Sequence, residues 1–300
     1  STLKNLSGKF SFINGDLQSE PLTASWFNQP LNVDFSTKEG AKAYQVAVNL
    51  NGNWQPAKTG VLPAAVNEAL SGSVAWDGKV GIDLPYHAGA TYNVELNGDL
   101  KNVSSHLPSP LAKPAGEPLP VNVKVDGNLN SFELTGQAGA DNHFNSRWLL
   151  GQKLTLDRAI WAADSKTLPP LPEQSGVELN MPPMNGAEWL ALFQKGAAES
   201  VGGAASFPQH ITLRTPMLSL GNQQWNNLSI VSQPTANGTQ VEAQGREINA
   251  TLAMRNNAPW LANIKYLYYN PSVATTRGDS TQSSPFPTTE RISFRGWPDA

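Results

Sequence analysis

The stretch Val74-Ala75-Trp76-Asp77-Gly78-Lys79-Val80-Gly81-Ile82-Asp83-Leu84 decides the fold class of this chain. Apart from Gly78, every second residue from Val74 to Leu84 is apolar, and the residues between them are polar or small. This period of two is typical of a β-strand with one dry face, because successive side chains point to opposite faces of a sheet. The alternation keeps its phase throughout, so the pattern predicts one long strand.

An apolar residue followed by Asn or Asp, Gly, a polar residue and another apolar residue occurs five times in the first half of the chain. The copies begin at Ile13, Leu50, Trp76, Leu96 and Val125. Asn-Gly and Asp-Gly between alternating apolar residues are also the strongest short signal for a β-hairpin turn. The motif therefore indicates either turns or positions inside long strands.

The flanks of the motif help to choose between these interpretations. A strict two-residue turn would put Trp54 on the polar face, whereas an unbroken strand or a three-residue loop keeps Leu50 and Trp54 together. We favour long strands with the glycine on the apolar face, at a bend or a bulge. This interpretation applies to Gly52, Gly78, Gly98 and Gly127. A true turn remains open at Gly15, because the residues before it do not keep one phase.

The same alternation continues over most of the chain, for example at Tyr44–Leu50, Val121–Val125, Ile211–Leu213 and Ile248–Met254. It predicts a mainly β protein whose antiparallel sheet buries one face. No βαβ rhythm is present, so a doubly wound parallel sheet is not expected. We expect residues 1–300 to form a single continuous segment.

Only two short helices are expected, at residues 63–70 and 186–198. The first has Pro63 in its first turn, and the second follows Asn185 with Glu188 three positions later, as in a capping box. Three irregular stretches separate the strand patterns and are expected to be loops of the sheet's rim. They span residues 104–120, 164–172 and 270–290.

Composition excludes several classes of function. The chain has 21 basic and 24 acidic residues, a net charge of −3, and no basic cluster that would suit a nucleic acid. It has no cysteine, which excludes disulfides, Cys-ligated zinc and thiol catalysis. Its four histidines are scattered without the spacing of metal ligands. We therefore expect no catalytic residues, metal or cofactor, and an enzyme is the least favoured class.

The chain has no apolar run near the roughly 20 residues that a membrane-spanning helix needs. It begins at Ser1 inside a patterned stretch, and Ile292-Ser293-Phe294 near its end reads like an unfinished strand. We expect a piece of a longer protein, with any signal or anchor outside it.

The segment Leu100-Lys101-Asn102-Val103, leading into Leu107-Pro108-Ser109-Pro110-Leu111-Ala112-Lys113, resembles the AsmA-like envelope proteins. The resemblance covers the whole chain, and the Leu-Pro-x-Pro-Leu-x-Lys segment is its most specific part. It implies a repeating β-groove, in which a long curled sheet forms a U-shaped trough with an apolar lining and a polar outside. It also implies one section of a bridge that carries phospholipids across the periplasm of Gram-negative bacteria toward the outer membrane. Membrane contact, including an inner-membrane anchor, would come from parts of the full-length protein outside this chain.

A groove of this kind would take up acyl chains through the apolar residues that the alternation selects. Keeping one CH₂ group out of water is worth about 0.8 kcal/mol. Moving an acyl chain of about 16 carbons from a bilayer into water would therefore cost about 13 kcal/mol, which an apolar surface along the path would offset. The predicted lining residues are Val46, Val48, Leu50, Val74, Trp76, Val80, Ile82, Val94, Leu96, Val121, Val123, Val125, Leu213, Ile230 and Leu252.

Two alternatives remain open from the residues alone. The helix at 186–198 lies either over the mouth of the groove or on its rim. The whole chain could also be an antiparallel β-sandwich that serves as an adhesion or glycan-binding module, because a sandwich buries alternate residues in the same way. The deciding observation is whether the apolar face contacts protein across the sheet or is left open.

Overall fold

The computed structural model describes residues 3–60, 62–197 and 205–271. Most of these residues belong to strands. The strands of the first half are β1 (Lys4–Ser7), β2 (Phe10–Ile13), β3 (Asp16–Ser19), β4 (Leu22–Trp26), β5 (Gln29–Glu39), β6 (Ala43–Trp54), β7 (Leu70–Gly72), β8 (Val74–Pro85), β9 (Thr91–Asp99), β10 (Val103–Ser105), β11 (Pro120–Asn128), β12 (Ser131–Ala138) and β13 (Asn142–Leu150). Those of the second half are β14 (Leu154–Ala162), β15 (Gly176–Asn180), β16 (Met184–Asn185), β17 (Ala205–Ser206), β18 (Ile211–Leu220), β19 (Gln223–Thr235), β20 (Gly238–Gln244), β21 (Ile248–Arg255) and β22 (Leu261–Leu267).

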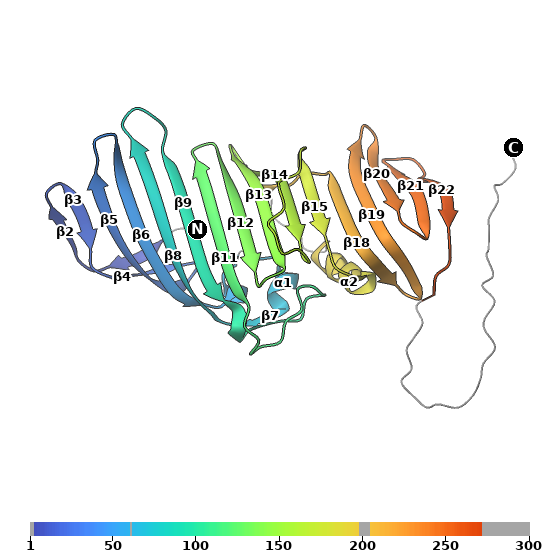
Figure 1. The fold of residues 1–300 in the computed structure, drawn as a ribbon, viewed down its shortest axis with the longest axis horizontal. Helices are drawn as coiled ribbons and strands as arrows, with labels where there is room; N and C mark the ends of the chain where they lie inside the picture. Colours follow the sequence, from blue (N-terminus) through green and yellow to red (C-terminus); the bar gives the residue numbers. More distant parts are fainter. Residues whose placement is uncertain (1–2, 61, 198–204, 272–300) are drawn as a thin grey trace, which may run out of the picture.

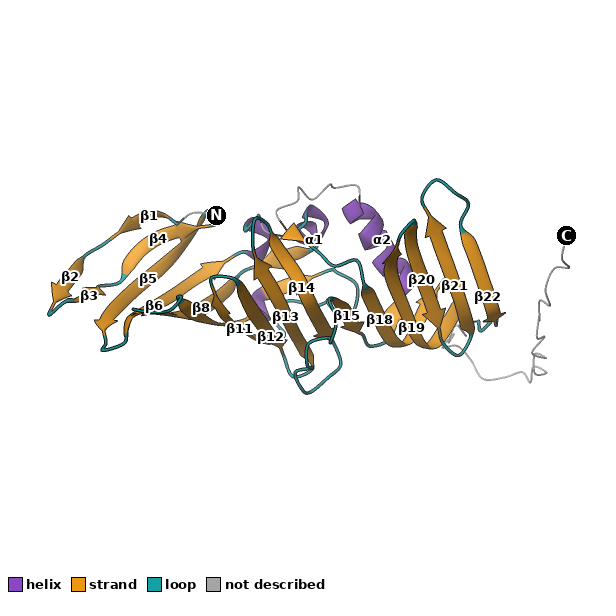
Figure 2. Cartoon of the chain, turned by 90° about the horizontal axis from the view of Figure 1, so that it is seen from above, coloured by secondary structure: helices purple, strands orange, loops and turns teal. Residues whose placement is uncertain are grey.

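All of these strands except β7 and β10 belong to one 20-stranded sheet, and β7 and β10 form a separate two-stranded sheet. From β5 the pairing runs through β6, β8, β9 and β11 to β15, and then through β18 to β22. The strands stand side by side along the long axis of the molecule (Figure 1). Seen from above, the sheet curls instead of lying flat (Figure 2). The predicted mainly β fold with a long curled antiparallel sheet is confirmed.

The sheet departs from antiparallel pairing in the region of β14–β18. β15 is parallel to both β14 and β18, β17 is parallel to β14, and β16 is parallel to β18. The chain between β15 and β18 contains a helix. One β–α–β crossover is therefore present, although the sequence analysis found no such rhythm. A single crossover beside a five-residue strand gives no repeated pattern, which explains why the sequence did not reveal it.

The glycine motifs lie inside strands at four of their five positions, as predicted. Gly52 lies in β6, Gly78 in β8, Gly98 in β9 and Gly127 in β11. Of the bend or bulge expected at these glycines, the bulge is wrong, because β6, β8, β9 and β11 pair with their neighbours there without a shift of register.

Neighbouring side chains explain these glycines better than a bulge does. A Cβ atom on Gly127 would lie 2.6 Å from the ring of Tyr92, and one on Gly78 would lie 2.6 Å from a methyl group of Leu96. A large side chain on the next strand therefore covers the space that each glycine leaves, as aromatic residues do over glycines in other sheets.

The fifth motif forms a real turn. Asn14 and Gly15 have φ angles of +52° and +90°, and Ile13 pairs with Asp16. Two successive residues with positive φ make the two-residue hairpin turn that Asn-Gly favours.

The two predicted helices are present as α1 (Ala64–Glu68) and α2 (Gly186–Ala197). Asn185 begins α2, because its Oδ1 accepts a hydrogen bond from the Ala187 N–H at 3.1 Å and its Nδ2 donates to Glu188 Oε1 at 2.8 Å. This arrangement satisfies one of the free N–H groups of the first turn. Figure 2 shows α1 and α2 near each other on one side of the sheet.

The three loop-rich stretches differ in their environment. Residues 104–120 include part of β10 and carry the buried side chain of Leu107. Residues 164–172 run beside the sheet, where the carbonyl oxygen of Pro169 accepts a hydrogen bond from Asn145 Nδ2 at 3.1 Å. Of residues 270–290, all those beyond 271 lie outside the described residues, as does the expected strand at Ile292–Phe294.

The carboxylate of Glu247 holds the far end of the sheet together. Glu247 is 5% exposed and accepts hydrogen bonds from the Asn226 backbone N–H at 2.6 Å, from Asn226 Nδ2 at 2.8 Å and from Asn270 Nδ2 at 3.1 Å. These contacts join β19 to the turn after β20 and to the chain after β22.

We expect Glu247→Ala to lower the local free energy of opening in β19–β22 by about 2–3 kcal/mol, because three partly buried donors then lose their carboxylate acceptor. Hydrogen exchange of the backbone amides in these strands measures this change. Glu242→Ala is the matched control, since that side chain is exposed and accepts a hydrogen bond from Gln240. Equal protection in the two variants would contradict this role of Glu247.

Candidate functional site

One face of the sheet carries two unbroken rows of mostly apolar residues that cross it from β5 to β22. Cross-strand pairing gives the first row as Phe35, Val48, Val80, Val94, Val125, Leu134, Ser146, Ala159, Val177, Ile211, Ser232, Val241, Leu252 and Ala262. The second row lies two residues away on every strand and consists of Val33, Leu50, Gly78, Leu96, Val123, Gly136, Phe144, Trp161, Leu179, Leu213, Ile230, Ala243, Ala250 and Ile264. We call this surface the groove face.

The register places all of the predicted lining residues on the groove face. Most belong to the two rows. Val46, Trp76, Ile82 and Val121 lie two residues beyond the rows along their strands, and Val74 lies four residues beyond them. Every one of the predicted residues is partly buried, and none is fully buried. Side chains between two packed sheets would be excluded from water, so this face is covered only in part.

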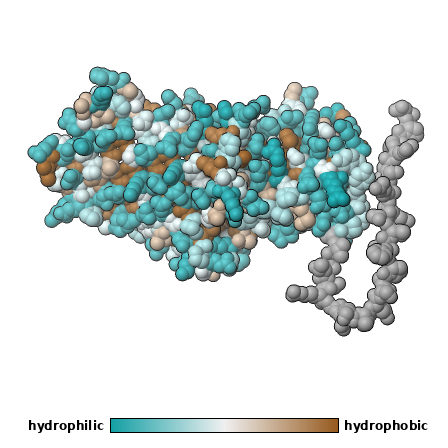
Figure 3. Space-filling view, viewed as in Figure 1, coloured by the Kyte–Doolittle hydropathy of each residue, from teal (hydrophilic) through white to brown (hydrophobic). Residues whose placement is uncertain are grey.

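The opposite face is polar. Lys79 of β8, Glu95 of β9 and Lys124 of β11 lie in one cross-strand row, and the Lys124 Nζ and Glu95 Oε1 atoms are 3.8 Å apart. These residues alternate with Val80, Val94 and Val125 of the groove face, so the sheet is amphipathic along its length. Figure 3 shows the brown hydrophobic surface in the left half and centre of the molecule, bordered by teal hydrophilic side chains.

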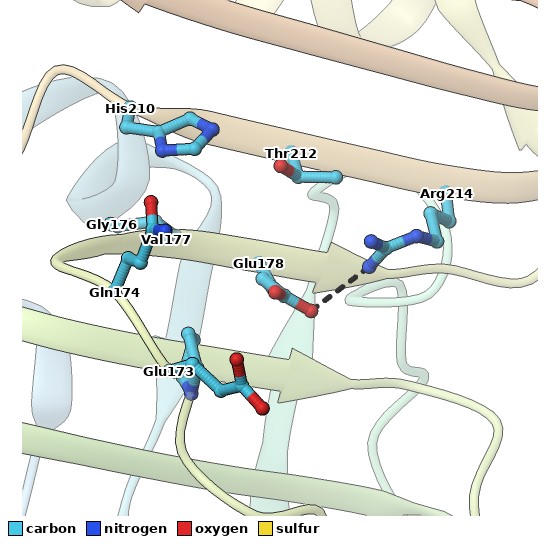
Figure 4. A pocket seen from close by; sticks show the side chains of 9 residues that line it. Glu173, Gln174, Gly176, Val177, Glu178, His210, Thr212 and Arg214 are labelled. Carbon is cyan, nitrogen blue, oxygen red and sulfur yellow. Dashed lines mark hydrogen bonds and ion pairs between the residues drawn. The ribbon is translucent and has the colours of Figure 1, made fainter.

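A polar pocket of about 310 Å³ lies on this opposite face, over β15 and β18 (Figure 4). Glu178 and Arg214 point toward each other there, with Oε2 and Nη1 2.9 Å apart. Glu178 alternates with Val177 and Leu179 of the groove face. The charged pocket and the apolar rows are therefore separated by the sheet itself.

The groove face is packed more closely at two places, one at its β5 end and one near the middle of the sheet. At β4–β6 a cluster of Ala24, Leu31 and Val33 packs against Val48, Leu50, Trp26 and Trp54. At β14–β18 a cluster of Ala163, Met181 and Met184 packs against Leu179, Leu213 and Trp189 among others. Trp189 belongs to α2, so this helix lies against the groove face.

An apolar chamber of about 650 Å³ lies between the groove face and the loop after β10. Val121, Val123, Leu134, Phe144 and Trp161 line it on the sheet side, and Leu107, Pro110 and Leu111 line it on the loop side. Sequence reasoning missed the contribution of Leu134, Phe144, Trp161 and the loop. Phe144 could have been found, because Phe144, Ser146 and Trp148 alternate with polar residues, but the loop carries no periodicity.

Nothing else among the described residues forms a recognisable reactive centre. In the described ranges no group of three or more His, Asp or Glu side chains is placed to hold a metal ion. Within the same ranges, no helix is both long and apolar enough to cross a bilayer. The β-sandwich alternative is not favoured, because the large sheet has no second sheet of comparable size opposite it among the described strands.

Fold and site together define a class of protein: a single-layer, curled β-sheet with an amphipathic cross-section and an apolar groove. The family model described as "YhdP protein" matches residues 1–300, and the chain belongs to that family. It is 97% identical over 300 residues to the "Intermembrane phospholipid transporter YhdP" of Escherichia coli (strain K12). The match covers all of this chain and 24% of that protein, so the chain spans about a quarter of its curated relative. No solved structure shows significant similarity.

Proposed function

We propose that this chain is one continuous section of an apolar groove that carries phospholipid acyl chains between two membranes. The single observation that supports this best is the second row of the groove face, which crosses the sheet from Val33 to Ile264 with only apolar residues and glycine and stays partly open. A transported acyl chain needs such continuity, because any polar gap would expose it to water. The predicted lining residues, from Val46 to Leu252, are the proposed contacts.

The energetics fit a passive path. About 0.8 kcal/mol per buried CH₂ is enough to hold an acyl chain on the groove face. Neighbouring positions along the rows are similar in chemistry, so a chain that moves from one strand to the next exchanges one apolar contact for another. The charged headgroup can stay in water at the open side. Such a path needs no nucleophile, metal or cofactor, and we propose no enzymatic activity.

The proposed location is the periplasm of a Gram-negative bacterium, with lipid moving toward the outer membrane. The name of the Escherichia coli relative supports transport between membranes. Contact with the inner membrane is assigned to parts of the full-length protein outside this chain. The proposed partner is therefore the phospholipid itself, and a nucleic acid is not expected to bind.

The proposal predicts that the full-length protein, purified in mild detergent, retains phospholipid. Solvent extraction and mass spectrometry should detect phospholipid at or above one molecule per protein. A soluble periplasmic protein purified in the same way is the control for carry-over. Phospholipid at the level of this control, together with selective binding of an oligosaccharide, would contradict the proposal and favour a glycan-binding module.

A further inference from the structure

Residues 106–112, which we call the strap, cross over the groove face at β11–β14. We propose that the apolar chamber beneath the strap binds an acyl chain of a phospholipid, so that lipid passes here through a covered section of the groove. The inference rests on the proposed function, and it adds a specific binding site and the segment that covers it.

The strap is fixed at both of its ends. Ser105 and Lys113 pair through two backbone hydrogen bonds of 2.7 and 2.9 Å, which closes the loop between them. The Lys113 ammonium group donates to the carbonyl oxygens of Val103 at 3.0 Å and Pro114 at 2.9 Å. Leu107 is only 7% exposed. The strap is therefore a built part of the fold that faces the sheet.

The middle of the strap is held by helix α2. The indole N–H of Trp189 in α2 donates to the carbonyl oxygen of Ser109 at 3.0 Å. Lys195 of α2 in turn forms an ion pair with Glu68 of α1. The strap and the two helices thus form one connected cover along this side of the groove.

The chemistry of the chamber fits a hydrocarbon chain better than a charged headgroup. Lys113 and Glu117 are the only charged side chains that line it among the described residues. The Lys113 ammonium group is already bonded to backbone carbonyls, and Glu117 is exposed. No unpaired cation is therefore available to a phosphate inside the chamber. Its volume of about 650 Å³ lies within the roughly 300–1,000 Å³ of ordinary ligand sites.

Gly136 leaves open space in the chamber floor. It belongs to the second row of the groove face, between Val123 and Phe144. A Cβ atom there would have its nearest neighbours at 3.8–4.0 Å, which are ordinary contacts. By contrast, a Cβ atom on Gly127 would lie 2.6 Å from Tyr92. Gly136 is therefore a position where a larger side chain can fill the chamber without moving the backbone.

Photocrosslinking in cells that make the full-length protein tests the proposal. A photoreactive amino acid at Leu111 in the strap should crosslink to phospholipid, and so should one at Val80 on the uncovered groove face. Adding Gly136→Phe should lower the Leu111 crosslink at least fivefold and leave the Val80 crosslink in place. Gly89→Phe is the matched control, because a Cβ atom there meets nothing within 4 Å and Gly89 lies outside the chamber lining.

The possible outcomes separate this inference from the proposed function. A Val80 crosslink without a Leu111 crosslink overturns the chamber and leaves the groove intact. Absence of both crosslinks contradicts the proposed function itself. A Leu111 crosslink that Gly136→Phe does not reduce also overturns the chamber. The variant Gly136→Ala should retain the full Leu111 crosslink. Loss of this crosslink in Gly136→Ala would show that the glycine serves the fold and that the chamber assignment is wrong.

Discussion

The substitution Val94→Asp is expected to slow phospholipid transport in the full-length protein by a factor of several tens, up to about 100-fold. Val94 lies in the first apolar row, between Val80 and Val125. An acyl chain that crosses this row would have to remove water from a carboxylate, which costs about 2–3 kcal/mol even with partial compensation. A barrier increase of about 1.4 kcal/mol slows a rate about tenfold. The arrival of pulse-labelled phospholipid in the outer membrane measures the effect.

The control for this variant is Asn93→Asp, which adds the same charge one residue away. Asn93 is exposed and points to the polar face of the sheet. It should transport phospholipid at the normal rate. Equal slowing by the two variants, or no slowing by Val94→Asp in a folded protein, would contradict the assignment of the groove face as the lipid path.

The second large effect is expected from Gly72→Ala, which should detach the small sheet that supports the strap. Gly72 has a φ angle of +95° and pairs with Val103, and a Cβ atom there would lie 2.0 Å from the carbonyl oxygen of Asn102. The left-handed backbone costs about 1–2 kcal/mol in a residue with a side chain. Overpacking against a backbone atom adds about 1–3 kcal/mol. We expect faster limited proteolysis between residues 100 and 120.

Gly116→Ala separates backbone strain from the close contact. Gly116 has nearly the same φ angle of +94°, but a Cβ atom there would meet nothing within 4 Å. Gly116→Ala should lose only the stability that the left-handed backbone costs, without the added cost of overpacking. If the two variants were cleaved at equal rates, the close packing of β7 against β10 would not be what holds the strap.

Sequence alone was enough to assign the groove face where the strands are long and strictly alternating. The alternation from Val74 to Leu84 determines which side chains share a face, because the period of a strand is two. The same alternation selected Leu213, Ile230 and Leu252, and the register places them on this face too. The same reasoning selected the strand interior for Gly52, because a tight turn would have moved Trp54 to the polar side.

Sequence could not provide the cover over the groove. The strap has no periodicity, and its contact with α2 joins Ser109 to Trp189, 80 residues apart. The parallel pairing of β15 was also missed, since five residues of alternation do not indicate strand direction. Both features depend on contacts between distant segments, which a local pattern does not contain.

Photocrosslinking along consecutive residues of β8, β9 and β11 in the full-length protein tests the central claim most directly. The account predicts phospholipid crosslinks at Val80, Val94 and Val125, with a period of two along each strand. It predicts none at Lys79, Glu95 and Lys124, which lie between them on the polar face. Crosslinks of equal strength on both faces, or only on the polar face, would contradict the account.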